Sequence, residues 1–159
     1  MLTRFGKETK IILVGLSMGA ATVLMATGLD LPENVKGVIA DCGYSTPKDI
    51  LGAVIKMMKL PVAPVYFLVR LSAMLFGGFD PDSASAKEAL SRCKIPVLLI
   101  HGEGDHLVPC EMSRENYEAC VSEKELFTVP EAEHGMSYLL DTEGYTERVK
   151  AFLQRNFAP

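Results

Sequence analysis

A single serine, Ser17, stands between two glycines in the stretch "ILVGLSMGAATVLM" and has the surroundings of a nucleophile. Gly15 and Gly19 flank it two residues away on each side, which is the G-x-S-x-G pattern of a sharp strand-to-helix turn. Neighbours at these positions crowd such a turn, so we expect both to be required as glycine. The turn would hold the serine hydroxyl away from the sheet in a strained conformation, ready to attack a carbonyl carbon.

A serine hydroxyl needs a base, and the base needs an acid that orients it. His134 in "PEAEHGM" and Asp105 in "HGEGDHLVP" follow Ser17 in the order serine, acid, histidine. Each follows a predicted strand, and parallel strands gather their carboxyl ends at one edge of a sheet. We therefore predict Ser17 as the nucleophile, His134 as the base and Asp105 as the orienting acid.

Other residues compete for these roles. Asp41, at the end of "VIAD", is the second choice for the acid, and Glu103 is a weaker one. His101 ends a predicted strand, where a structural role is expected, and His106 lies in the loop just after it.

The turn also suggests where negative charge would be stabilised. The backbone N–H of Met18 opens the following helix and points to where an oxyanion would form. The alternative is a glycine-rich turn that only packs tightly or binds a phosphate, but no G-x-G-x-x-G and no lysine after the turn support a nucleotide site.

Four apolar runs predict the strands that must position these residues. They are "KIILVG", "VKGVIADC", "IPVLLIHG" and the shorter "KELFTVP", at residues 10–15, 35–42, 95–102 and 124–130. Helical spacing of apolar residues between them and near the C-terminus completes an alternating pattern. This pattern predicts an α/β fold with a mainly parallel sheet of about four strands.

Residues 44–83 interrupt this alternation with about forty residues that contain no strand signal. The stretch "KLPVAPVYFLVRLSAMLFGGFDP" is apolar and broken by prolines. We expect one or two helices inserted as a lid over the site, with two ordinary crossover helices as the alternative.

The uncharged run at residues 11–29 has the length of a membrane span, and the cations before it are typical of a signal peptide. Three glycines and the polar residues Ser17, Thr22 and Thr27 argue against a span. No clean cleavage site follows. We expect no stable membrane span.

The composition is that of one globular domain of 159 residues with a net charge of −4, which excludes nucleic acid as an expected partner. Four widely spaced cysteines form no C-x-x-C pair, so no metal site is expected. They suggest reduced thiols in a cytoplasmic protein. Cys110 follows the "HGEGDHLVP" motif and could lie near a pocket.

Together, "GLSMGA", "HGEGDHLVP" and "EHG" resemble the α/β-hydrolase family of serine hydrolases, in particular bacterial esterase-like and peptidase-like members. The resemblance covers almost the whole chain. It implies the same triad, Met18 as an oxyanion donor, no cofactor, and residues 44–83 as the family's variable lid.

The resemblance covers only the later part of the family's domain. Similar proteins carry about a hundred residues before the strand that leads into the serine turn, which is called the nucleophile elbow. Those residues include a loop that supplies a second oxyanion N–H. We therefore interpret residues 1–159 as a truncated domain whose first strand has an open apolar edge. Such an edge invites pairing, so we expect a homo-oligomer or a missing N-terminal fragment.

Two functions follow from this interpretation. The first is hydrolysis of an ester, thioester or amide of a small-molecule acyl substrate, carried out weakly if an oxyanion donor is lost. The second is a non-catalytic half-domain that oligomerises or binds a partner. The complete triad favours the first, because a scaffold needs none of the three residues.

Overall fold

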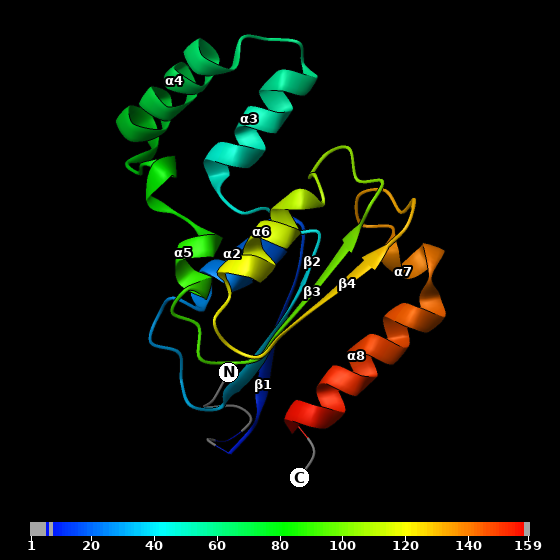
Figure 1. The fold of residues 1–159 in the computed structure, drawn as a ribbon. Helices are drawn as coiled ribbons and strands as arrows, with labels where there is room; N and C mark the ends of the chain where they lie inside the picture. Colours follow the sequence, from blue (N-terminus) through cyan, green and yellow to red (C-terminus); the bar gives the residue numbers. More distant parts are fainter. Residues whose placement is uncertain (1–5, 7, 158–159) are drawn as a thin grey trace.

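Four parallel strands form one sheet in the computed structural model, which describes residue 6 and residues 8–157 (Figure 1). The strands follow one another across the sheet in sequence order. They are β1 (Ile11–Leu16), β2 (Val35–Asp41), β3 (Val97–Gly102) and β4 (Lys124–Val129). All four lie where the apolar runs predicted them, which confirms the α/β fold.

Helices cover both faces of this sheet. Figure 1 shows α2, α5 and α6 on one face and α8 on the other. The helices have the bounds α2 (Met18–Ala26), α5 (Ala86–Leu90), α6 (Glu111–Ala119), α7 (Ser137–Leu140) and α8 (Thr142–Phe157). The parallel connections require such crossovers, because each new strand must begin at the same edge as the one before it.

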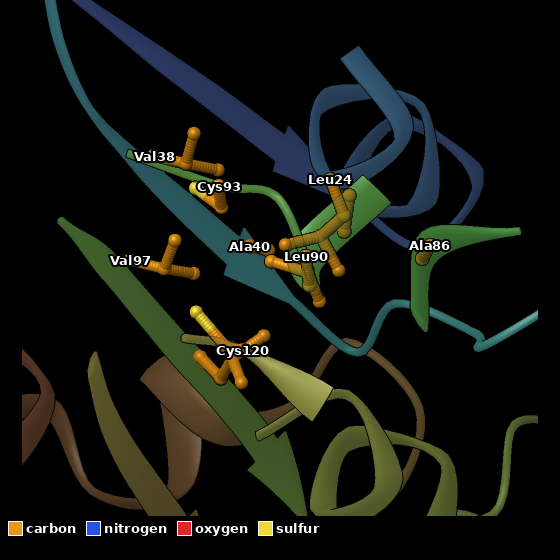
Figure 2. Packing of buried hydrophobic residues seen from close by; sticks show 10 residues of the cluster. Leu24, Val38, Ala40, Ala86, Leu90, Cys93, Val97 and Cys120 are labelled. Atoms are coloured by element: carbon orange, nitrogen blue, oxygen red, sulfur yellow. The ribbon is translucent and has the colours of Figure 1, made fainter. Parts of the chain in front are cut away.

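The core is divided by the sheet into two layers, because side chains alternate between faces along a strand. Val38, Ala40, Val97 and Leu99 pack under α2 and α5, together with Leu24, Leu90, Cys93 and Cys120 (Figure 2). Ile39, Leu98 and Ile100 point the other way and pack against Phe152 of α8. Both central strands, β2 and β3, are therefore buried on both faces, as parallel strands generally are.

The uncharged run at residues 11–29 is not one helix but a strand, a turn and a helix. Within the described residues, no single helix is long and apolar enough to cross a membrane. The segments Val62–Gly77 and Pro81–Leu90 meet the criteria of length and composition only as a pair, and they are bent by 93° relative to each other.

Residues 44–83 contain no strand, as predicted, and form helices: α3 (Pro47–Met57), α4 (Val62–Ser72), the π-helix η1 (Ala73–Gly77) and the 3₁₀ turn η2 (Pro81–Ser83). Thr46 caps α3 by accepting a hydrogen bond from the N–H of Asp49. Lys59 lies just beyond α3 with φ +59°, and Pro61 is the N-cap residue of α4. This sharp turn makes α3 and α4 a helical hairpin that stands away from the sheet (Figure 1).

Candidate active site

Ser17 occupies the turn between β1 and α2 with an unusual backbone conformation. Its φ is 54° and its ψ is −116°, a combination that side chains rarely adopt. The N–H of Ser17 donates to the carbonyl of Asp41 in the neighbouring strand, at 2.8 Å. The strained turn is thus held by the sheet, as the G-x-S-x-G pattern predicted.

The two glycines of the pattern do not contribute equally. A Cβ on Gly15 would overlap the backbone of Gly19 and Ala20, because β1 and the first turn of α2 nearly touch there. A Cβ on Gly19 would meet no atom within 4 Å. The expectation that both positions require glycine is therefore wrong for Gly19, whose Cα–Cβ direction points into open space.

The structure brings Ser17, His134 and Asp105 together in one chain of hydrogen bonds, although they come from three separate loops. His134 Nε2 lies 2.8 Å from Ser17 Oγ, and His134 Nδ1 lies 2.7 Å from Asp105 Oδ2. An ionised carboxylate can only accept, so Nδ1 carries the proton that it donates to Asp105. Nε2 is then an acceptor for the Ser17 hydroxyl.

Asp105 is held in place by backbone as well as by the imidazole. Its Oδ1 accepts hydrogen bonds from the N–H groups of Leu107 and Val108, at 2.9 and 2.8 Å. Burial alone would raise the pKa of the Asp105 carboxyl. Hydrogen bonds from His101, the Val108 N–H and His134 outweigh burial and lower this pKa below its usual value of 3.8. The carboxylate therefore stays charged and fixes the orientation of His134.

His101 contacts this chain of hydrogen bonds at its acid, because its Nε2 lies 3.3 Å from Asp105 Oδ2, whereas Asp41 and Glu103 have different partners. Buried His101 contacts Ser113 Oγ and the Val108 carbonyl, at 2.6 and 2.8 Å, and His106 is exposed. Asp41 accepts from the hydroxyl of Tyr145, and Glu103 pairs with Arg114. Their positions match the structural role expected for His101 and leave Asp105 as the acid that contacts His134.

Met18 begins α2 directly after the serine. Its N–H belongs to the first turn of the helix, where backbone N–H groups have no partner within the helix. The Met18 side chain is 71% exposed. The N–H is thus adjacent to Ser17 at the positive end of the helix dipole.

Cys42 is a neighbour of the triad that the motifs did not point to. Its thiol and the ligand atoms of Asp105 and His134 all lie within 4.8 Å of one another, a grouping that could hold a metal ion. Burial, together with the charge of Asp41, raises the pKa of the Cys42 thiol to about 12. This disfavours the thiolate that a metal requires. The sequence did offer one sign that Cys42 would lie near the site: it follows β2 directly, and functional groups gather at the carboxyl ends of parallel strands.

A pH titration tests the environment of Asp105. A carboxyl group whose folded pKa is lowered contributes stability above its unfolded pKa of 3.8, and this contribution is lost as the pH falls through the lower folded value. We expect urea unfolding to show a smaller loss of stability in acid for Asp105→Asn than for the parent. Burial raises the folded pKa of Asp41, so this carboxyl group takes up a proton and stabilises the fold as the pH falls. Asp41→Asn removes this gain and should therefore steepen the loss of stability in acid. Parallel pH profiles for the parent and Asp105→Asn would contradict this assignment.

Comparison with known families matches residues 12–135 to the family described as serine hydrolase (FSH1). The chain belongs to this serine hydrolase family. The matched segment begins in β1 and ends one residue after His134, so it contains all three residues of the hydrogen-bonded chain.

Among curated proteins, this chain is 29% identical over 140 residues to YqkD of Bacillus subtilis, covering 87% of this chain and 46% of that protein. A 49-residue stretch, 31% of this chain, is 41% identical to 18% of a bifunctional esterase/perhydrolase of Acinetobacter calcoaceticus. The chain thus spans about half the length of YqkD.

Solved structures share the fold. An esterase of Pyrococcus furiosus superposes with a TM-score of 0.68 at 27% identity, covering 94% of this chain and 55% of the esterase. A puromycin-hydrolyzing peptidase of Mycobacterium tuberculosis gives a TM-score of 0.75 at 20% identity, covering 99% of this chain and 24% of the peptidase, a likeness of fold alone. These comparisons confirm the α/β-hydrolase fold inferred from the motifs.

Proposed function

We propose that this serine hydrolase cleaves carboxylic esters through an acyl-enzyme formed on Ser17. His134 Nε2 takes the proton of the Ser17 hydroxyl as Oγ attacks the carbonyl carbon. The tetrahedral intermediate then collapses, the proton passes from His134 to the leaving alcohol, and the acyl group remains on Oγ. Water, activated by the same imidazole, releases the acid and restores the serine.

Asp105 and Met18 have supporting roles in this proposal. Asp105 stabilises the imidazolium that forms when His134 accepts the proton, and the carboxylate itself stays ionised. The N–H of Met18 donates to the oxyanion at the positive end of α2. This chemistry draws on side chains and backbone N–H groups alone.

The surroundings of the triad favour an apolar acyl group. Leu16 and Met18 flank the nucleophile, Leu107 follows the acid by two residues and Met136 follows the base by two; all four are 41–71% exposed. We propose that they contact the acyl chain and that residues 44–83 act as a lid above it. An acyl ester therefore fits this site better than a charged substrate.

The continuous hydrogen-bonded chain Ser17–His134–Asp105 is the observation that carries this proposal. Membership of the serine hydrolase family supports it and disfavours a purely structural module. Because β1 pairs only with β2 and leaves one sheet edge open within the described residues, we also propose that this edge receives a strand from a second copy or a companion segment.

The test is covalent labelling by a fluorophosphonate probe, which reacts only with an activated serine. We expect a single adduct located at Ser17 by peptide mass spectrometry, and none in Ser17→Ala. Ser45→Ala is the matched control, because Ser45 is buried and bonded to Asp49. An adduct on another serine, or none on the folded protein, would contradict the proposal.

A further inference from the structure

The helical hairpin and the π-helix after it carry more exposed large apolar side chains than any other part of the described chain. We call residues 50–79, which contain most of α3, all of α4 and η1, the arm. More than half of the exposed large apolar side chains lie in the arm, and Phe67, Leu75 and Phe76 are exposed by 63, 68 and 89%. Apolar surface of this extent on one projecting element marks an interaction site.

The arm also differs from the rest of the chain in charge. Residues 50–79 contain Lys56, Lys59 and Arg70 but no aspartate or glutamate, whereas the whole chain has a net charge of −4. The arm is thus a cationic segment in an acidic protein, so its partner is expected to be anionic.

The three cations have different surroundings. Arg70 donates to both carboxylate oxygens of Asp80, at 2.8 and 2.6 Å, and pairs with Asp82 at 2.7 Å. Lys56 and Lys59 are exposed, and within the described residues neither has an acidic side chain within 4.0 Å. The uncompensated charge is therefore concentrated where α3 ends.

These lysines alternate with apolar residues at the tip of the arm. The left-handed conformation of Lys59 turns the chain sharply there, and the N–H of Leu60 bonds back to the carbonyl of Ile55, at 3.1 Å. Met57 and Met58 are 56 and 62% exposed and Leu60 is 43% exposed. The loop at the tip projects away from the sheet (Figure 1), and its apolar side chains and its cations are both exposed.

We propose that the tip of the arm docks on an anionic lipid surface. Met57, Met58 and Leu60 would enter the boundary between headgroups and acyl chains, while Lys56 and Lys59 would contact the phosphates. This places the tip at the bilayer surface and does not require the arm to span the bilayer. The inference rests on the arm alone and is independent of the proposed catalysis.

A second copy of this chain fits the tip less well than a lipid surface. In a symmetric dimer the two tips would face each other, and their lysines would meet without an acidic residue in either arm. A protein partner also needs a complementary surface of about 800 Å² on each side. A projecting tip with flexible methionines and lysines suits a fluid anionic surface instead.

The experiment is co-sedimentation of the full chain with vesicles of phosphatidylcholine alone or mixed equally with phosphatidylglycerol. We expect binding to the mixed vesicles that weakens with added salt, and little binding to phosphatidylcholine. The double variant Lys56→Glu, Lys59→Glu should bind at least about tenfold more weakly. Each lysine near an anionic surface raises the binding affinity by a factor of roughly five. Met58→Ser with Leu60→Ser should also weaken binding while leaving the charge unchanged.

Matched controls distinguish binding through the arm from a general effect of the net charge of the protein. Lys36→Glu with Lys94→Glu makes the same change in net charge at exposed positions near the amino ends of β2 and β3, and should bind like the parent. Ser17→Ala should also bind like the parent. Equal binding to both vesicle types, equal loss in the two charge variants, or arm variants that only convert an oligomer to a monomer would each overturn the proposal, provided that circular dichroism shows the variants folded.

Discussion

Replacing His134 with alanine is expected to lower kcat for a p-nitrophenyl ester by roughly 10⁴-fold or more, with a much smaller change in KM. The Ser17 hydroxyl would lose the acceptor that lies 2.8 Å away, and at neutral pH an unassisted serine is a poor nucleophile. The rate of fluorophosphonate labelling should fall in parallel, because it depends on the same activated oxygen.

His106→Ala is the control for this experiment. His106 is exposed and lies one residue after Asp105, so it samples the same loop without belonging to the hydrogen-bonded chain. It should retain the parent rate of hydrolysis and labelling. If the two variants lose activity equally, or if neither does, His134 is not the base.

Replacing Gly15 with alanine is expected to destabilise the fold by about 3 kcal/mol or more. The new Cβ would overlap the backbone of Gly19 and Ala20, and backbone cannot move aside as a flexible side chain can. The turn at Ser17 would have to widen, and the start of α2 would move away from β1. Urea unfolding followed by circular dichroism measures the change; the chain contains no tryptophan, which removes the usual fluorescence signal.

Gly19→Ala is the matched substitution, since it adds the same methyl group four residues away. Its Cβ would meet no atom within 4 Å, and alanine favours a helix over glycine by up to about 1 kcal/mol. It should therefore leave the free energy of unfolding unchanged or raise it slightly. Similar destabilisation by both substitutions would show that the crowding at Gly15 does not control the turn.

The relation between the site and the fold explains why half the length of YqkD suffices to assemble the triad. Ser17 follows β1, Asp105 follows β3 and His134 follows β4, so the three loops all leave the same edge of one sheet. Four parallel strands in sequence order place these loops side by side. The labelling and kinetic experiments measure how reactive the serine of this assembly is.

The sequence by itself determined the type of fold and predicted which residues would form the hydrogen-bonded chain. Continuous apolar runs located all four strands. The reason is clearest for β2 and β3, because strands buried on both faces leave little choice of residue. The order of Ser17, Asp105 and His134, each after a strand, identified the hydrogen-bonded chain, because a parallel sheet collects its loops at one edge. The spacing of residues along the chain was therefore enough to predict which loops meet at one edge of the sheet, because the order of the strands sets the order of the loops.

Only the tertiary structure decided which contacts those residues make. A Cβ would be crowded at Gly15 but not at Gly19, because of how closely β1 approaches α2. The sequence motif does not specify that approach. Cys42 lies near the triad because β2 ends beside it, and the arm exposes its apolar side chains because α3 and α4 pack on each other rather than on the sheet. Such distances depend on how elements far apart in the chain pack together, so they became visible only when the fold was complete.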